Sequence, residues 1–107
     1  MKIFILKKSI SDLKKPIVRN EYDTEAMTVG DFIAEMVKKN YAARPAKFSL
    51  DDCISTATSE FEDGSYYIVN TTKNVKYALL EQAADFSDGD EIVLIKLKYV
   101  RGIIWDL

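Results

Sequence analysis

The stretch EIVLIKLKYV, residues 91–100, carries apolar side chains on both faces of an extended chain. Successive side chains of a strand point to opposite faces, so Ile92 and Leu94 share one face. The other face carries Val93, Ile95, Leu97 and Tyr99. A strand that is apolar on both sides is typical of the centre of a sheet. The sequence therefore predicts a sheet built around residues 91–100.

Four shorter strands are predicted to complete this sheet. Their bounds are 1–8, 16–22, 65–70 and 75–80, with turns at 9–16 and 71–74. The second strand is the weakest, because its apolar content is only Ile17 and Val18, and it begins at Pro16, a residue tolerated at the first position of a strand. Residues 65–70 and 75–80 are close enough in sequence to form a hairpin.

The clearest helix covers residues 28–41, TVGDFIAEMVKKNY. Thr28 is a good N-cap, and Asp31 stands three residues later as a variant of the capping box. One buried stripe at helical spacing contains Val29, Phe32, Ile33, Met36 and Val37. Lys38 and Lys39 are predicted to lie in the last turn, and Asn40 to end the helix.

A second, shorter helix is predicted within residues 49–64, after a connector at 41–48. Ser49 is its expected N-cap, and Gly64 its expected stop. Its apolar face contains Leu50, Ile54, Ala57 and Phe61. Several serine and threonine side chains weaken the helical preference of this stretch.

The order of these elements predicts the fold class. With 107 residues, the chain is expected to be a single domain, residues 1–107. Strand, strand, helix, short helix and three more strands indicate an α+β fold, with a mixed sheet of four or five strands packed on one main helix. The first and last strands are expected to lie side by side and parallel at the sheet centre.

In the order of its elements, the sequence resembles the ubiquitin-like β-grasp family. MKIFIL resembles the opening strand of the family, MTVGDFIAEMVKKN its helix, and DGDEIVLIKLKYVRG its acidic turn and final strand. The resemblance covers residues 1–40 and 64–102, with residues 41–63 as an insertion. It implies a curled mixed sheet around one helix, in a protein that serves as a modifier, a sulfur carrier or a non-covalent docking module.

The tail departs from the pattern of the carrier members, which end in two glycines. Here Gly102 stands alone and is followed by IIWDL. A peptidase that cleaved after Gly102 would expose a tail with a single glycine, so Gly102 is a possible processing site. The preferred prediction is that Gly102 makes a bend and that the apolar residues after it pack back on the domain. Docking of this end on a partner is the alternative.

One face of the sheet is expected to stay apolar on the side away from the helix. If Ile3 and Ile5 face the helix, Phe4 and Leu6 point outward. Three explanations are open for such a face: cover by the insertion or the tail, a symmetric homodimer, or a docking surface. Cover by the insertion or the tail is the favoured explanation.

The chemistry that the sequence offers is limited, because the chain has no histidine. This removes the commonest general base and metal ligand. Cys53 is the only cysteine and is expected to be a small buried residue in a cytoplasmic protein. The acidic loop with Asp85, Asp88, Asp90 and Glu91 is interpreted as a tight turn rather than a calcium site.

The tyrosines and lysines of the strands allow two interpretations. They are Tyr66, Tyr67, Tyr77 and Tyr99, with Lys73, Lys76, Lys96 and Lys98. Rings and cations can bind nucleic acid, but a net charge of −2 favours ordinary cross-strand pairing.

The sequence therefore predicts a non-enzymatic protein-interaction module without a cofactor or metal. Its expected partner is another protein, not nucleic acid or a membrane, and the chain is expected to be a monomer or a weak homodimer. The predicted anchor residues are Phe4, Leu6, Ile95 and Trp105. The alternative is a ubiquitin-like modifier or carrier, matured by cleavage after Gly102.

Overall fold

The computed structural model describes residues 1–10 and 18–105. Within these residues the chain forms a five-stranded sheet, two α-helices and a short 3-10 turn, η2, so the fold is α+β. In chain order the elements are β1 (Lys2–Ser9), β2 (Arg19–Asp23), α1 (Val29–Ala43), α2 (Leu50–Glu62), β3 (Tyr66–Asn70), β4 (Val75–Tyr77), β5 (Glu91–Lys96) and η2 (Ile103–Trp105).

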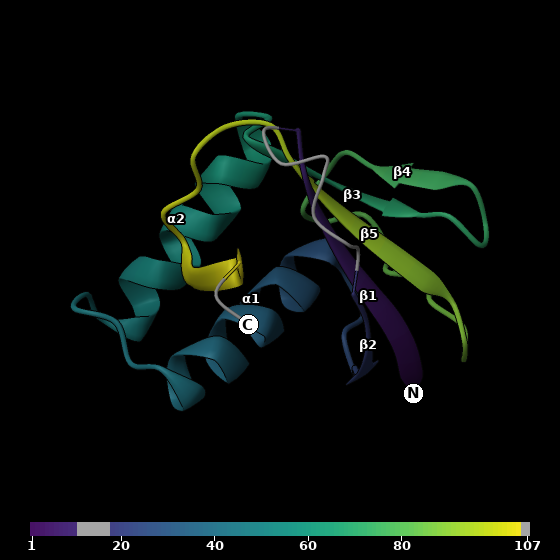
Figure 1. The fold of residues 1–107 in the computed structure, drawn as a ribbon, viewed down its shortest axis with the longest axis horizontal. Helices are drawn as coiled ribbons and strands as arrows, with labels where there is room; N and C mark the ends of the chain where they lie inside the picture. Colours follow the sequence, from purple (N-terminus) through teal and green to yellow (C-terminus); the bar gives the residue numbers. More distant parts are fainter. Residues whose placement is uncertain (11–17, 106–107) are drawn as a thin grey trace.

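The sheet has the strand order β2-β1-β5-β3-β4, with β5 in the middle (Figure 1). β1 and β5 are parallel, and the other three pairs are antiparallel. The predictions of a central last strand, and of parallel first and last strands, are both confirmed. The expected hairpin also forms, since Ile68 pairs with Tyr77 and Asn70 with Val75.

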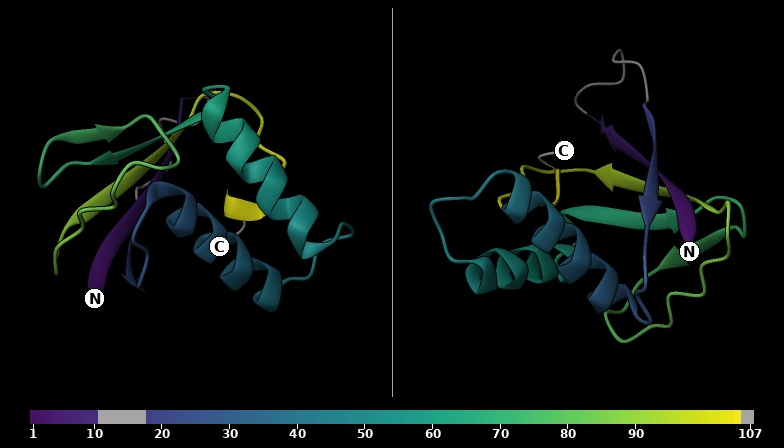
Figure 2. Two further views of the ribbon diagram at one scale, coloured as in Figure 1. Left: turned by 180° about the vertical axis from the view of Figure 1, so that it is seen from behind. Right: turned by 90° about the horizontal axis from the view of Figure 1, so that it is seen from below.

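Both helices and η2 lie on the same side of the sheet (Figures 1 and 2). The strands send one set of side chains toward the helices, among them Ile3, Ile92 and Leu94, which are fully buried. α1 contributes Phe32 and Ile33 to this core, also without exposed surface. The molecule therefore has two layers and a single core between them.

α1 begins as the sequence predicts. The Thr28 hydroxyl accepts a hydrogen bond from the Asp31 amide at 3.1 Å. The next free amides of the first turn are also used, because the Val29 and Gly30 amides donate to carbonyls in the loop at 80–82. The expected end is wrong: the helix continues to Ala43, so the two lysines lie before its last turn. Asn40 is a buried residue inside the helix.

α2 confirms the weaker helical prediction. The Ser49 hydroxyl accepts from the Asp52 amide at 3.1 Å, and Cys53, Ala57 and Phe61 are buried. Gly64 follows the helix with a φ of 80°, a conformation that glycine adopts at little cost.

Three strands are shorter than the sequence predicts by two or more residues, and β3 is shorter by one. β5 ends at Lys96, because the amides of Leu97 and Lys98 both donate to the Ser65 carbonyl and turn the chain away. β4 ends at Tyr77, after which the chain crosses to the start of α1. β2 begins only at Arg19, and Val18 before it is 64% exposed. Pro16, Ile17 and most of the predicted turn at 9–16 lie outside the described residues.

The prediction that the insertion or the tail covers the outer face of the sheet is wrong. α2, which forms most of the insertion, packs against α1 and β3 on the core side. η2 packs against α1 and α2 on that same side, as Figure 2 shows. The reason is the face that each segment buries: Phe61 and Ile104 belong to the core between sheet and helices. Among the described residues, no helix covers the opposite side of the sheet.

Candidate functional site

The uncovered side of the sheet carries a continuous set of apolar side chains, which we call the open face. Its members are Phe4, Leu6, Tyr67, Val69, Val93 and Ile95. The strand registers place Leu6 beside Val93, and Val93 beside Val69. Lys8 and Glu91 lie on the same side, in register with Ile95 and Phe4, so these three strands present an apolar band with one cation and one anion at its margins.

The side chains of the open face are neither fully buried nor fully solvated. Val93, in the middle, is 7% exposed because its neighbours on β1 and β3 shield it. Phe4, Leu6 and Ile95 are half-buried. A surface of this kind loses little conformational entropy when a partner covers it, since its side chains are already ordered by their neighbours.

Two cations border the open face. The Arg19 guanidinium lies 3.7 Å from the centre of the Phe4 ring, and the Lys76 ammonium lies 3.9 Å from the centre of the Tyr67 ring. Arg19, on β2, is in register with Leu6 of β1. Lys76, on β4, is in register with Val69 of β3. The apolar band therefore runs across β1, β5 and β3 between one cation on each edge strand.

The structure brings together three of the four predicted anchor residues. Phe4, Leu6 and Ile95 lie on the open face, so their side chains can contact one partner at once. Trp105 does not join them. Its ring lies 6.0 Å from the ring of Tyr66, on the core side of the sheet. Trp105 is therefore part of the packing of η2 rather than of the open face.

Sequence reasoning missed the contributions of β3 and of the two edge cations. The alternation in YYIVN could have placed Tyr67 and Val69 on one face. The positions of Arg19 and Lys76 depend on the register between strands, which the sequence alone does not supply.

The segment Arg101–Trp105, which we call the closing segment, is held between the helices. The Glu60 carboxylate accepts hydrogen bonds from the Arg101 and Gly102 amides at 2.7 and 2.8 Å. The side-chain amide of Asn40 donates to the Ile103 carbonyl at 2.5 Å. The prediction that this end packs back on the domain is confirmed, since Ile103 and Ile104 are buried.

Gly102, the possible processing site, is buried in this segment. A Cβ atom on Gly102 would lie 2.7 Å from the backbone of Ala57, closer than such atoms approach. Glycine is therefore required for the close approach of the segment to α2. A peptidase could reach the bond after Gly102 only if the closing segment left its place.

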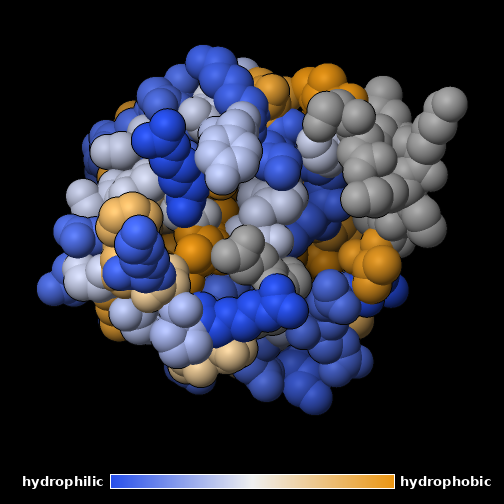
Figure 3. Space-filling view, turned by 60° about the vertical axis from the view of Figure 1, so that its left-hand side comes forward, coloured by the Kyte–Doolittle hydropathy of each residue, from blue (hydrophilic) through white to orange (hydrophobic). Residues whose placement is uncertain are grey.

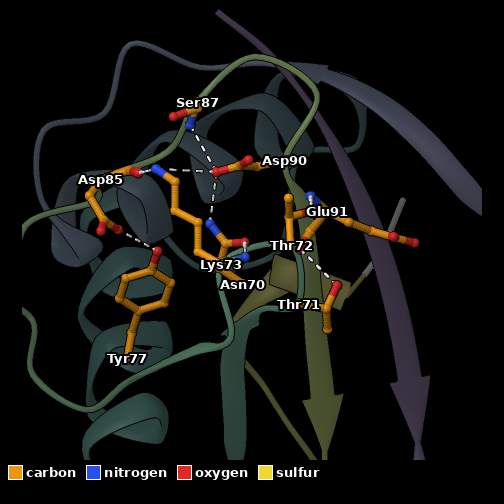
Figure 4. A network of polar contacts seen from close by, with 9 residues as sticks. All are labelled: Asn70, Thr71, Thr72, Lys73, Tyr77, Asp85, Ser87, Asp90 and Glu91. Atoms are coloured by element: carbon orange, nitrogen blue, oxygen red, sulfur yellow. Dashed lines mark hydrogen bonds and ion pairs between the residues drawn. The ribbon is translucent and has the colours of Figure 1, made fainter.

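A polar network fixes the acidic loop to the hairpin (Figure 4). The Asp90 carboxylate accepts from the Asn70 side chain and from the Ser87 amide, both at 2.9 Å. The Lys73 ammonium lies 3.5 Å from the same carboxylate and also donates to the Asp85 carbonyl. The Tyr77 hydroxyl donates to the Asp85 carboxylate at 2.7 Å. The carboxylates of Asp85 and Asp90 are thus used within the protein.

These contacts change the titration of the groups involved. Burial alone raises the pKa of Asp90, but the hydrogen bonds from Asn70 and the Ser87 amide, together with the Lys73 charge, outweigh it. The pKa of Asp90 therefore lies below its ordinary value. Burial, with the nearby Asp85 carboxylate, raises the pKa of the Tyr77 hydroxyl. Asp90 is charged and Tyr77 neutral near neutral pH.

The remaining interpretations of the sequence concern metal binding, membrane spans, the tight turn at Asp88 and the tyrosines and lysines of the strands. In the part of the chain that the structure describes, no cluster of three carboxylate or thiol side chains is arranged to hold a metal ion. Within the same part, no helix has the length and apolar character needed to cross a membrane. Gly89 has a φ of 84° in the tight turn expected after Asp88. Tyr66 and Tyr77 are buried, and Lys76 pairs with Tyr67.

Cys53 is buried, as expected, and is one of the residues that line a cavity of about 360 Å³ beside α2. The lining consists of Phe48, Asp52, Cys53, Ser55, Thr56 and Arg101. Phe48 in this lining is 67% exposed. With the α2 side of Figure 1 brought forward, Figure 3 shows a mostly hydrophilic surface with smaller apolar areas between. The cavity mixes opposite charges with an aromatic ring and does not indicate one class of ligand.

Comparisons of the chain with protein-family models, with curated proteins and with solved structures found no match.

Proposed function

We propose that this chain is a ubiquitin-like β-grasp domain that docks non-covalently on another polypeptide through its open face. The observation that carries the proposal is the one-sided cover of the sheet. α1, α2 and the closing segment all occupy the core side, and the apolar side chains of β1, β5 and β3 have no described element over them. Apolar faces that a domain leaves uncovered are often interaction surfaces.

The β-grasp part of the proposal is supported by topology. The sheet is mixed, its first and last strands are parallel neighbours, and α1 crosses the face between the two halves. α2 then corresponds to the insertion at residues 41–63 that the resemblance implies. Because many functions occur on one fold, the topology supports the family assignment but does not select the activity.

A docking role without catalysis is supported by three carboxylates that are engaged in hydrogen bonds within the chain. The carboxylates of Asp90, Asp85 and Glu60 accept hydrogen bonds from the protein itself. The modifier or carrier matured after Gly102 stays an alternative, but no contact of the closing segment favours it. We therefore place the function on the open face.

The proposal is tested by affinity capture with variants that place a charge on the open face. Leu6→Glu and Ile95→Glu each introduce a carboxylate into the centre of the band, where a partner would have to desolvate it. Ser55→Glu, at an exposed position on α2, adds the same side chain elsewhere and serves as the matched control. Tagged proteins are used to capture from a lysate of the source cells, and bound proteins are compared by quantitative mass spectrometry.

The expected result is at least one protein that the wild type and Ser55→Glu recover equally, and that both open-face variants lose by about tenfold or more. Thermal unfolding of each variant confirms that it folds. Equal recovery of every bound protein by all four chains would show that the open face is not the docking surface.

A further inference from the structure

We infer that the open face binds an acidic segment of its partner, one that places carboxylates over Lys8, Arg19 and Lys76 and apolar side chains between them. The inference rests on the proposed function, since it takes the open face as the docking surface. It adds the chemistry of the polypeptide that docks there, and it follows from the distribution of charge across the face.

Two cations stand at the ends of one row of the open face, which we call the Leu6 row, and a third lies beside it. The row crosses all five strands, and its side chains are in register from each strand to the next. The third cation, Lys8, is exposed and lies two residues beyond Leu6 on β1, on the same face. In the order β2, β1, β5, β3 and β4, the members of the row are Arg19, Leu6, Val93, Val69 and Lys76.

Within residues 1–10 and 18–105, no carboxylate forms an ion pair with any of the three cations. The Arg19 guanidinium and the Lys76 ammonium instead lie over aromatic rings of the same face, at 3.7 and 3.9 Å from the ring centres. Like Lys8, both residues are exposed. Carboxylates of a bound segment can therefore approach all three without displacing an acid of the described chain.

The two acidic residues nearest the Leu6 row lie one row away, and one of them is already neutralised. Glu21 and Glu91 are both in register with Phe4. The Glu21 carboxylate lies 4.0 Å from the Lys2 ammonium of its own chain. Glu91 has no ion pair among the described residues, so it would repel a carboxylate placed over Phe4. The acids of the bound segment are therefore expected over the Leu6 row, away from Glu91.

The width of the sheet sets the length of the bound segment. The two end cations, Arg19 and Lys76, stand on the first and last of five strands, which at the usual spacing are about 19 Å apart. An extended chain spans this distance with about six residues, and an α-helix with about thirteen. A peptide of about 16 residues is therefore long enough to bind in either conformation.

Three cations also attract nucleic acid, but the composition of the open face favours a polypeptide. The centre of the face consists of aliphatic side chains, which pack against apolar groups and offer no ring on which a base can stack. The rings of Phe4 and Tyr67 each have a cation over them. Glu91 on the face, and a net charge of −2 on the chain, oppose a continuous run of phosphates. A polypeptide can place single carboxylates where the cations are.

The inference is tested by selection from a phage-displayed library of about 16 randomised residues, with the full chain as bait. The wild type is compared with a variant in which the three cations of the open face are reversed. The substitutions of this variant are Lys8→Glu, Arg19→Glu and Lys76→Glu. Lys8→Glu is also made alone, because no contact of its side chain is recorded within the described residues, so this variant should keep the fold.

The matched control reverses three exposed cations outside the open face and has the same net charge as the triple variant. Its substitutions are Lys38→Glu, Arg44→Glu and Lys47→Glu. Thermal unfolding confirms that each variant folds. Binding of a labelled synthetic copy of the most enriched peptide is then measured by fluorescence polarisation.

We expect the wild type to enrich peptides that combine apolar residues with an excess of acidic ones. The dissociation constant of the most enriched peptide should rise by about tenfold or more in the triple variant, by about threefold in Lys8→Glu, and by less than about twofold in the control. Raising the salt concentration from about 50 mM to about 500 mM should weaken binding to the wild type, because the carboxylates and the cations lie at the surface.

No enrichment, or enrichment of peptides without an excess of acids, would overturn the inference. So would an acidic peptide that binds the triple variant as tightly as the wild type, or an oligothymidine of about 20 nucleotides that binds the wild type more tightly than the peptide does. If acidic peptides fail but capture still depends on Leu6 and Ile95, the proposed function holds and only the inference fails. If capture is also unchanged by Leu6→Glu and Ile95→Glu, both fail.

Discussion

Gly102 shows how one residue without a side chain determines where a whole segment lies. Its Cα approaches α2 so closely that a methyl group would meet the backbone of Ala57. Gly102→Ala should lower the free energy of unfolding by about 1–3 kcal/mol, as overpacked sites do. Chemical denaturation of the two chains measures the difference. Ala57→Gly should not rescue the variant, because two of the three close atoms belong to the backbone; full rescue would contradict this explanation.

Asp90 supplies a prediction on pH. Its folded-state pKa lies below the ordinary value, so it binds fewer protons in the folded chain than in the unfolded chain. Its contribution to stability is complete above the unfolded pKa, about 3.9, and is lost as the pH falls through the lower folded pKa. Asp90→Asn should therefore lower the free energy of unfolding by about 1–3 kcal/mol at pH 7, and by much less near pH 2.

Urea denaturation at a series of pH values checks this prediction. Glu81→Gln removes a carboxylate at an exposed position outside the helices and is the control, with little effect expected at any pH. A loss of stability in Asp90→Asn that stays constant from pH 7 to about pH 2 would assign the effect to packing rather than to charge.

At the scale of single residues, the sequence predicted what depends on local pattern. Thr28 and Ser49 cap their helices as expected, because capping requires only a hydroxyl three residues before an amide. Asn40 was misread as a helix end, since its role is to bind a carbonyl 63 residues away. The contact of Trp105 with Tyr66 could not be predicted for a similar reason, because the two rings become neighbours only in the folded chain.

The closing segment is the element whose attachment depends most on one side chain. The Glu60 carboxylate accepts hydrogen bonds from two successive backbone amides of the segment, those of Arg101 and Gly102. Glu60→Ala should leave both amides without their acceptor and lower the free energy of unfolding by about 1–3 kcal/mol. The fluorescence of Trp105, the only tryptophan, reports on the segment itself.

Glu62→Ala, two residues further along α2 at an exposed position, is the matched control. We expect it to leave both stability and fluorescence near those of the wild type. Hydrogen exchange at the Arg101 and Gly102 amides should accelerate in Glu60→Ala alone. Equal exchange rates in the two variants would mean that Glu60 does not hold the segment.

Element boundaries were harder to predict than element types. α2 was recognised despite its serines and threonines, because its apolar residues have helical spacing. β5 was predicted four residues too long, although its sequence continues as a strand to Val100. The reason is tertiary: the Ser65 carbonyl captures the next two amides. The sequence of a strand does not show that a carbonyl elsewhere in the chain will accept its next amides and end it.

For the molecule as a whole, the buried place of Gly102 bears on processing. A peptidase needs an extended segment, and the closing segment is hydrogen-bonded and packed on both sides of this glycine. We expect intact-mass measurement of the protein from its native cells to show no species that ends at Gly102. Treatment of the purified chain with a non-specific protease, as a control, should likewise spare this bond until the protein unfolds. A major species ending at Gly102 would instead support the modifier or carrier.

The topology of the sheet was predictable, and the orientation of its faces was not. A strand that is apolar on both sides, together with a single long crossover, was enough to place the first and last strands at the centre. That same two-sided pattern hid the open face, because Leu94 and Ile95 are equally suited to a core. The positions of α1, α2 and η2 decide which of the two is covered.

The parallel pairing of β1 with β5 has a consequence for synthesis on the ribosome. Phe4 finds its neighbour 87 positions later, at Glu91. Until that stretch has left the exit tunnel, the edge of β1 that pairs with β5 and its apolar side chains stay exposed. Only the five-residue β2 can pair with β1 at this stage. The centre of the sheet therefore cannot form until residues 91–96 have been synthesised, and a chaperone that shields β1 until then would raise the yield of native protein.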